Sequence, residues 1–212
     1  MNFWDTSDDY GTHPHVAAAL QQINREEVIV MTKTSAETVE EAEKSRHRSL
    51  EELGTDHIDI MLLHYVKPGW IANTKEILEF LHEAKSKGLL RAVGLSTHSV
   101  ETTRRVASLT TVEVVLTVAN KRGSWVQEGQ EHWIEDGQMS DMWAAIKEAY
   151  QAGKGVCLMK ILGSGTVDPS EAIDYMTPHP YFHSLVIGMK SLEEVKMNLG
   201  LMQGGQSDRP NR

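Results

Sequence analysis

The sequence predicts an α/β fold, a (β/α)8 barrel in which seven of the eight βα units are visible. Two observations carry this prediction. Short apolar segments alternate with helical patterns along the whole chain, and polar residues close most of these segments. Continuous apolar runs rich in β-branched residues are typical of strands buried on both faces of a parallel sheet. We expect such strands at residues 2–5, 28–33, 58–64, 91–96, 112–120, 156–160 and 185–188.

Residues typical of helix starts and helix ends occur in the segments between these strands. Thr34 and Glu37 have the spacing of a capping box, and Gly54 stands where the following helix would end. Capping patterns or apolar stripes of helical period predict further helices that begin at Asn73, end at Gly153, begin at Asp168 and begin at Ser191. Strand and helix therefore alternate throughout, as an α/β fold requires.

An open, doubly wound sheet is the alternative architecture. A GxGxxG motif after the first strand would favour it, but Thr6-Ser7-Asp8-Asp9 follows Asp5, and no glycine occurs before Gly11. A TIM barrel is favoured because the residues that close its strands share one face, where barrel enzymes keep their chemistry. The polar residues that close the predicted strands are Asp5, Lys33, His64, Ser96, Asn120 and Lys160.

The number of visible strands is one short of a complete barrel. Met1 begins directly on a strand, so our interpretation is that the first strand and the first helix are missing. This would leave two unpaired strand edges, through which the protein could self-associate. We assign residues 1–202 to a single incomplete barrel domain and expect residues 203–212 to be a polar, disordered tail. Residues 121–137 form one long connection, and a substrate lid and an ordinary insertion both remain open.

Charge and cysteine content exclude several classes of protein. Thirty acidic residues against 21 basic ones give a formal charge of −9, which disfavours nonspecific binding to nucleic acid. No apolar run approaches the ~20 residues of a membrane span, and no signal peptide precedes the first strand. The single cysteine, Cys157, suits a reducing cytosol. We expect a cytoplasmic protein with neither nucleic-acid nor membrane partners.

Four polar residues near one predicted barrel face form a coherent set for carbonyl chemistry. Tyr10 has an ordinary pKa of ~10 and is a poor proton donor near neutrality unless a cation stabilises its phenolate. Lys33 would supply that cation, and Asp5 would hold the ammonium in place. His64 would point a substrate carbonyl at Tyr10, so that the phenol protonates the carbonyl oxygen while hydride reaches the carbon. Because no side chain donates hydride, this chemistry requires a nicotinamide cofactor.

Five segments resemble motifs of the aldo-keto reductases, in that family's order. FWDTS at residues 3–7, leading to Tyr10 and Gly11, resembles the strand-two signature, and VMTK at 30–33 resembles the catalytic-lysine strand. SLEELGTDHID at 49–59, running on to LLH at 62–64, and GLLRAVGLS at 88–96 are similar to two further strand motifs. VIGMKS at 186–191, through residues 198–199, resembles the cofactor loop and final helix.

This resemblance implies a TIM-barrel carbonyl reductase that prefers NADP(H) and acts on a small carbonyl substrate. It implies Tyr10 as general acid, supported by Lys33, Asp5 and His64. Ser96 would contact the nicotinamide, residues 163–165 would lie near the pyrophosphate, and the start of the last helix would hold the ribose 2′-phosphate and the adenine. The implied cofactor-binding residues are Ser96, Thr97, Asn120, Gly163, Gly165, Gly188, Lys190, Ser191, Glu194, Lys196 and Asn198.

Elementary chemistry supports the assignment of the ribose 2′-phosphate to the start of the last helix. A lysine, a hydroxyl and free backbone N–H groups at a helix start make an anion site. A plain helix cap is the alternative interpretation of Ser191 and Glu194.

Several positions depart from the family pattern. Thr97 and His98 stand where the family generally has an asparagine after the strand-five serine. Leu116 replaces a glutamine that often contacts the nicotinamide, and Ala119 replaces an aromatic residue. These changes weaken the expected nicotinamide pocket more than the expected acid. A truncated or degenerate relative with little or no catalysis is therefore the alternative to an active reductase.

A third hypothesis comes from a different class of enzyme. His13 and His15 have the HxH spacing that metal-dependent barrel hydrolases use at a strand end. Here Pro14 separates them at a loop–helix entrance, where two-point ligation from a strand is unfavourable. A solvated pair of histidines is the alternative interpretation, and we assign no metal site.

Overall fold

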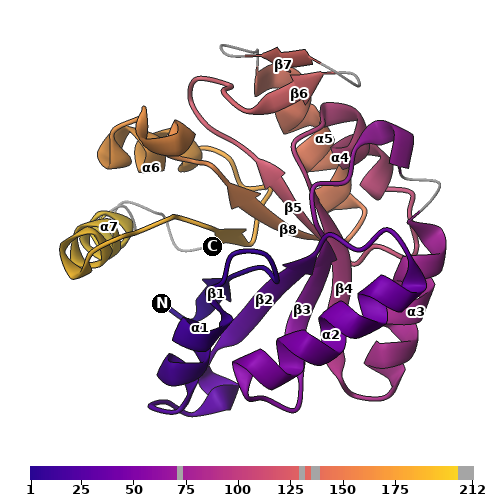
Figure 1. Cartoon of the computed structure of the whole chain (residues 1–212). Helices are drawn as coiled ribbons and strands as arrows, with labels where there is room; N and C mark the ends of the chain where they lie inside the picture. The colour runs from indigo at the N-terminus through magenta and orange to yellow at the C-terminus, as the bar shows by residue number, and fades with distance from the viewer. Residues whose placement is uncertain (71–73, 129–131, 135–138, 205–212) are drawn as a thin grey trace.

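The computed structural model describes residues 1–70, 74–128, 132–134 and 139–204 (Figure 1). Its main sheet has seven parallel strands, and neighbouring strands in it are also consecutive in the chain apart from the insertion of a small hairpin. The strands in sheet order are β1 (Phe3–Asp5), β2 (Ile29–Thr34), β3 (Ile58–Leu63), β4 (Leu90–Thr97), β5 (Val114–Val118), β8 (Gly155–Met159) and β9 (Ser184–Leu185).

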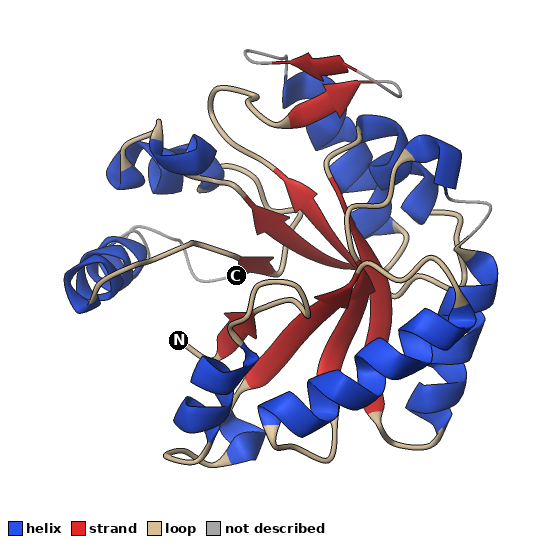
Figure 2. Cartoon of the chain, viewed as in Figure 1, coloured by secondary structure: helices blue, strands red, loops and turns tan. Residues whose placement is uncertain are grey.

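The sheet curls into a nearly closed barrel, with helices on its outer side (Figures 1 and 2). These are α1 (His13–Leu20), α2 (Val39–Leu53), α3 (Lys75–Ser86), α4 (Val100–Val106), α5 (Met139–Gln151), α6 (Pro169–Met176) and α7 (Leu192–Gly204). Short 3₁₀ helices lie at η1 (Arg25–Glu27), η2 (Pro68–Trp70) and η3 (Gly163–Gly165). The seven-strand α/β barrel predicted from the sequence is confirmed. Within the described residues, β1 and β9 do not pair with each other.

Side chains that alternate along the strands build two apolar layers. One small cluster fills the inside of the barrel, and a larger one packs the outer faces of the strands against the helices. The inner cluster contains Met31, Ile60, Leu62, Val114, Leu116 and Cys157. Since successive strand residues point to opposite faces, Val30 and Met61 belong to the outer cluster while Met31 and Ile60 belong to the inner one.

Gly94 in β4 allows the neighbouring strand to approach closely. A Cβ atom at this position would lie 1.8 Å from the backbone oxygen of Val114. The backbones of β4 and β5 therefore occupy the space that a side chain would need.

The helix starts correct one sequence expectation. The N-cap of α2 is Thr38, whose hydroxyl accepts from Glu41 N–H at 3.2 Å, so the capping box is Thr38 and Glu41. The prediction of Thr34 and Glu37 is wrong because Thr34 is the last residue of β2 and pairs with Leu63. The glycine end of this helix is confirmed, since Gly54 adopts φ +63°.

Other boundaries shift by a few residues. Strand β9 has only two residues, Ser184–Leu185, rather than 185–188. Helix α7 runs to Gly204, two residues into the segment expected to be a tail, and residues 205–212 lie outside the described residues, as does the expected helix start at Asn73. The long connection contains an antiparallel pair, β6 (Val126–Glu128) and β7 (His132–Ile134), that the sequence did not predict.

None of the helices in the described ranges is long and apolar enough to cross a membrane. This agrees with the absence of a long apolar run in the sequence.

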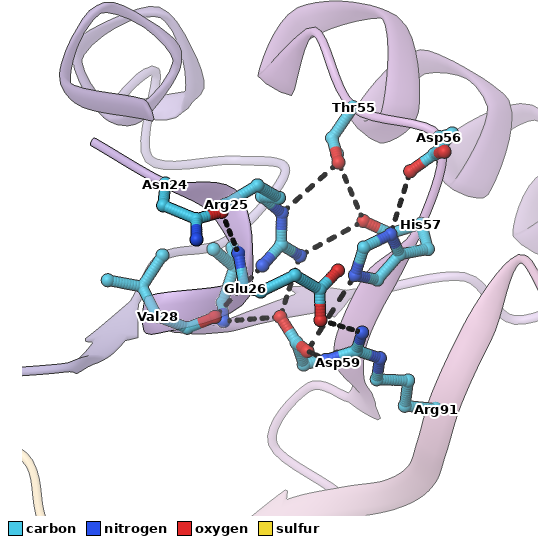
Figure 3. A network of polar contacts seen from close by, with 10 residues as sticks. Asn24, Arg25, Glu26, Val28, Thr55, Asp56, His57, Asp59 and Arg91 are labelled. Carbon is cyan, nitrogen blue, oxygen red and sulfur yellow. Dashed lines mark hydrogen bonds and ion pairs between the residues drawn. The ribbon is translucent and has the colours of Figure 1, made fainter. Parts of the chain in front are cut away.

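A charged network ties together the amino-terminal ends of β2, β3 and β4 (Figure 3). Asp59, whose side chain is 4% exposed, accepts from Val30 N–H at 2.8 Å and pairs with Arg25 at 2.6 Å. Its second oxygen pairs with Arg91 at 2.8 Å, and Arg91 also reaches Glu26 at 2.6 Å. A buried carboxylate needs such partners because its desolvation is costly. This network is the electrostatic anchor of the barrel's amino-terminal end.

We expect Asp59→Asn to lower the free energy of unfolding by about 3 kcal/mol, since it leaves two guanidinium groups facing a neutral amide in a buried position. Denaturant unfolding measures this change. Glu26→Gln is the matched control, and it should cost far less because Glu26 is mostly exposed and water screens its ion pair. Equal losses in the two variants would contradict the anchoring role of Asp59.

Candidate active site

The floor of the site is a buried ion pair at the carboxyl-terminal ends of β1 and β2. Lys33, which is 1% exposed, donates from Nζ to Asp5 Oδ1 at 2.6 Å and to the backbone oxygen of Thr6 at 2.7 Å. Both strands are parallel and adjacent, so Asp5, the last residue of β1, and Lys33, the next-to-last residue of β2, lie at the same end of the sheet. The ammonium is thus held by a carboxylate and a carbonyl, which offsets the cost of burying it.

Tyr10 and His64 lie above this pair. The Tyr10 hydroxyl is 3.4 Å from His64 Nε2, and Lys33 Nζ lies 5.0 Å from the centroid of the Tyr10 ring. Ser7 Oγ lies 3.4 Å from His64 Nδ1 and contributes to the orientation of the imidazole. The structure therefore brings together all four residues that the sequence predicts as a catalytic set, from the ends of three adjacent strands and the loop after the first.

Burial dominates the electrostatics of the ion pair. It raises the pKa of Asp5 and lowers the pKa of Lys33, and the attraction between the two charges offsets part of each shift. Burial likewise lowers the pKa of His64, with a further lowering by Lys33, and so favours the neutral imidazole.

The pKa of the Tyr10 phenol differs from the sequence expectation. We expected Lys33 to lower the pKa of Tyr10, but burial, followed by the carboxylates of Asp5 and Asp9, raises this pKa to about 12. Burial is the main cause, and Asp5, which sits 2.6 Å from the ammonium, also offsets the positive charge that would otherwise lower this pKa. Tyr10 is therefore firmly protonated at neutral pH.

A cavity of about 400 Å³ opens beside the phenol. Its lining residues are Tyr10, His64, Tyr65, Ser96, His98, Trp125, Met159 and Lys160. Tyr65, Trp125 and Met159 were not predicted as site residues, and the position of Trp125 depends on a loop that carries no motif. Lys160 was noted as a polar residue that closes a strand, which is the signal that could have assigned it to the site.

The predicted nicotinamide contacts divide into two groups. Ser96 lines the cavity, where its Oγ accepts from Tyr65 N–H at 2.9 Å and its own O–H can still donate. Thr97 does not line it, and its hydroxyl donates to Val66 O at 2.7 Å. Asn120 is fully buried and bonds its own loop, with Nδ2 donating to Ser124 O at 2.7 Å. Only Ser96 of these three presents a polar group to the cavity.

Residues 163–165 form a tight turn. Gly163, Ser164 and Gly165 all have positive φ, and a Cβ on Gly163 would lie 2.7 Å from Thr166 Oγ1. The N–H groups of Gly163 and Gly165 donate within the turn, to Lys160 O at 2.8 Å and to Leu162 O at 2.9 Å, so neither is free for the expected pyrophosphate. The side chain of Ser164 is exposed and can still meet an anion. Gly188, in the connection from β9 to α7, is exposed, with no atom within 4 Å of the position its Cβ would take.

The start of α7 is already occupied in part by its own side chains. Glu194 accepts from Lys190 N–H at 2.8 Å, and Ser191 Oγ accepts from Glu194 N–H at 3.2 Å. The expectation of free N–H groups here is therefore wrong for these two amides, because the capping contacts take them. The side chains of Lys190, Ser191 and Lys196 are exposed and remain able to meet an anion.

One buried polar atom on α7 fits a nucleotide. Asn198 is 3% exposed, and its Oδ1 has no hydrogen-bond partner within the described residues. An unpaired buried acceptor costs free energy unless a donor reaches it. An amine such as that of adenine would satisfy it. Together with Ser96, the exposed Ser164 and the cations of α7, this makes the residues present compatible with a dinucleotide.

The HxH pair does not form a metal site. His13 is buried, with Nδ1 2.7 Å from Glu52 Oε2 and Nε2 2.9 Å from Thr32 Oγ1, so both ring nitrogens are engaged. His15 is exposed. Both earlier interpretations, a ligand pair and a solvated pair, are wrong for His13, since it links α1 to α2 and β2. Within the described ranges, no group of three or more His, Cys, Asp or Glu is placed to hold a metal ion.

The comparison with protein families decides the identity of this site. The sequence profile described as "Aldo/keto reductase family" matches residues 1–123, which include the ion pair, Tyr10 and His64. The chain belongs to the aldo/keto reductase family. The resemblance noted in the sequence is thereby confirmed.

Curated relatives match only part of this aldo/keto reductase. It is 31% identical over 100 residues to the methylglyoxal reductase DkgB of Salmonella typhi, which covers 45% of this chain and 38% of that protein. It is 33% identical over 121 residues to an aldo-keto reductase of Mycolicibacterium paratuberculosis, covering 52% of this chain and 42% of the relative. These alignments therefore span about two fifths of the relatives' own lengths.

Solved structures support the barrel fold. PA4992 of Pseudomonas aeruginosa, assigned to the aldo-keto reductases, superposes with a TM-score of 0.80 at 21% identity, covering 97% of this chain and 78% of that one. The aldo-keto reductase AKR11C1 of Bacillus halodurans, in its holo form, gives a TM-score of 0.76 at 17% identity, with coverages of 100% and 78%. At these identities the likeness concerns the fold.

His98, one of the two histidines that line the cavity, makes the stability of the folded chain depend on pH. Burial is the main reason that the pKa of His98 falls from its usual 6.5 to about 4. Between these values the unfolded chain binds a proton that the folded chain does not, so stability rises with pH across this range and is lost as the pH falls from 6.5 to 4.

We expect His98→Gln to remove this contribution, which amounts to up to about 3 kcal/mol. The glutamine keeps a donor for the backbone oxygen of Trp125, which His98 Nδ1 meets at 3.0 Å. Denaturant unfolding of both proteins at neutral and at acidic pH measures the difference. Parallel pH dependence in the two proteins would contradict the buried, neutral state of His98.

Proposed function

We propose that the chain reduces an aldehyde or ketone to an alcohol with hydride from NADP(H). The observation that carries this proposal is the contact between the Tyr10 hydroxyl and His64 Nε2, 3.4 Å apart above the Lys33–Asp5 ion pair. Both groups line one cavity, so a carbonyl oxygen could meet the phenol and the imidazole together. The methylglyoxal reductases among the relatives also act on a small carbonyl compound by name.

In this proposal, Tyr10 is the proton donor. Its pKa of about 12 keeps the proton in place at neutral pH, and the alkoxide that forms on hydride transfer is a stronger base than the phenolate. Lys33 lies close enough to stabilise the phenolate after the proton has left. His64, with its lowered pKa, is neutral and orients the carbonyl oxygen by a hydrogen bond.

The residues that would hold the cofactor extend from the cavity to α7. Ser96 would meet the nicotinamide amide, and Asn198 would meet the adenine. In the 163–165 turn, the exposed side chain of Ser164 would meet the pyrophosphate. Lys190 and Lys196 favour NADP(H) over NAD(H), because their ammonium groups are exposed and can meet a 2′-phosphate. The bound cofactor supplies the hydride that no side chain can provide.

A relative with little or no catalysis is the second candidate function, and two observations favour it. Leu116 is fully buried and apolar where the family often has a glutamine that contacts the nicotinamide, and Ala119 is fully buried where the family often has an aromatic residue. The side chain of Asn120 bonds its own loop. The barrel is also open between β1 and β9 in the described residues.

Tyr10→Phe separates the two candidates. We expect the purified chain to bind NADPH in a fluorescence titration and to reduce a generic aldehyde, and the variant to bind NADPH equally well but to turn over roughly 10²–10⁴-fold more slowly. Tyr150→Phe, which removes a phenol from α5 outside the cavity, is the matched control and should leave turnover unchanged. Equal turnover in wild type and Tyr10→Phe would disprove the acid assignment, and NADPH binding without any turnover would favour the inactive relative.

We also propose that the open edge of β1 mediates self-association. Ile29 N–H donates to Asn2 O at 2.8 Å, and Thr6 N–H donates to Met31 O at 2.9 Å, so the even-numbered residues bond β2. In a parallel pair, the backbone groups of the alternate residues Phe3 and Asp5 then point to the other side, where an added strand could bind.

Phe3→Pro should shift the protein toward the monomer, since proline removes an outward N–H group without breaking a bond to β2. Light scattering coupled to size exclusion, over a range of concentrations, measures the mass. Phe3→Ala is the matched control: it removes the same side chain but keeps the N–H, and it should not change the mass. A wild type that stays monomeric at all concentrations would refute this proposal.

A further inference from the structure

Lys160 is a cavity residue to which the proposed chemistry gives no task. It follows β8 directly, at the carboxyl-terminal end of the barrel, and lines the same cavity as Tyr10 and His64. Its side chain is exposed to solvent, so a ligand that enters the cavity can reach it.

In the part of the chain that the structure describes, no carboxylate compensates the charge of Lys160, in contrast to that of Lys33. Lys33 is held by Asp5 and Thr6, whereas within the described residues Lys160 forms no salt bridge. Its ammonium lies over the ring of Trp125, whose centroid is 5.2 Å from Nζ. A cation over an indole face is attracted by the ring but keeps its hydrogen-bond donors for another partner.

The backbone holds this arrangement at a cost. Four non-glycine residues of the described chain have left-handed φ, and three of them line the cavity: Tyr65 at +55°, Trp125 at +68° and Lys160 at +60°. Each costs roughly 1–2 kcal/mol relative to ordinary backbone. Such strain gathers at functional sites, where the surrounding structure fixes a side chain in a required direction. Two of the three strained residues form the lysine–tryptophan contact.

Among the residues that line the cavity, Lys160 carries the dominant charge. His98 is neutral at physiological pH, since burial, and to a lesser extent the neighbouring Lys160, lowers its pKa to about 4. The other lining residues are aromatic or uncharged. On a protein with a net charge of −9, this cavity therefore favours an anionic group.

We propose that Lys160 is a specificity-determining residue that binds the carboxylate or phosphate group of an anionic carbonyl substrate, while Tyr10 and His64 face the carbonyl. This inference rests on the proposed function. The cavity of about 400 Å³ would hold the nicotinamide at Ser96 as well, so the substrate that reaches both Tyr10 and Lys160 beside it is a small molecule that carries both groups. A short oxo acid, or an aldehyde with an acidic group at its far end, is the substrate class that fits.

Two probes of the same shape and different charge test this inference. 4-Carboxybenzaldehyde carries a carboxylate, and 4-nitrobenzaldehyde carries a neutral group of similar size. We expect Lys160→Gln to lower kcat/KM for the carboxylate probe by about tenfold or more, mainly through KM, since a charge-assisted hydrogen bond is lost. The nitro probe should be nearly unaffected, and Lys160→Arg should retain the preference for the carboxylate.

Lys121→Gln is the matched control. It removes the same charge from a lysine outside the cavity lining that pairs with Glu171 at 3.3 Å, and it should change neither probe. If Lys160→Gln lowers kcat/KM equally for both aldehydes, or weakens NADPH binding in the fluorescence titration instead, the lysine serves a cofactor phosphate or the fold, and the inference is overturned.

Calorimetry separates this inference from the reductase proposal, because it needs no turnover. The chain is titrated with 4-(hydroxymethyl)benzoate and with 4-nitrobenzyl alcohol, each with and without NADP⁺. Binding of the carboxylate that weakens by about tenfold in Lys160→Gln supports the anion site even where no aldehyde is reduced. No carboxylate binding to the wild type, or equal binding to wild type and variant, overturns it.

Discussion

The buried contact between Lys33 and Asp5 is the interaction on which the site depends. An ammonium that is 1% exposed is tolerated only with a carboxylate at 2.6 Å and a carbonyl at 2.7 Å. The carbonyl belongs to Thr6, so the pair fixes the path of the loop that leaves β1. Ser7 and Tyr10 lie on this loop and reach His64 from it. Removal of either charge would therefore release the phenol as well as leave its partner unpaired.

The two ends of the barrel use charge in opposite ways. At the amino-terminal end, Asp59 is satisfied by Val30, Arg25 and Arg91, and the network fixes three strands to one another. At the carboxyl-terminal end, Lys160 is held by an aromatic ring and remains open to a ligand. This division between a stabilising end and a reactive end is the one that parallel barrels generally show.

Sequence reasoning found what depends on strand position and missed what depends on loop conformation. Asp5, Lys33 and His64 could be assigned because parallel strands bring their last residues to one face. Thr34–Glu37 and Thr38–Glu41 have the same spacing, and only the extent of β2 decides between them. The left-handed backbone of Tyr65 and Trp125, and the β6–β7 pair, carry no readable motif. The raised pKa of Tyr10 follows first from burial and then from two nearby carboxylates, and neither can be read from the sequence.

The opening between β1 and β9 affects the proposed catalytic residues and the proposed nucleotide-binding residues to different degrees. Asp5, Lys33 and His64 come from β1, β2 and β3, which are paired to one another and held by the buried ion pair. The residues assigned to the adenine end lie on α7, which follows the two-residue strand β9 at the other border of the opening. Strands β1 and β9 both pair on one side only within the described residues, and such strands are held less firmly than central ones, but β1 is also tied to β2 by the Lys33–Asp5 ion pair. Nucleotide binding is thus more sensitive to the opening than proton transfer is.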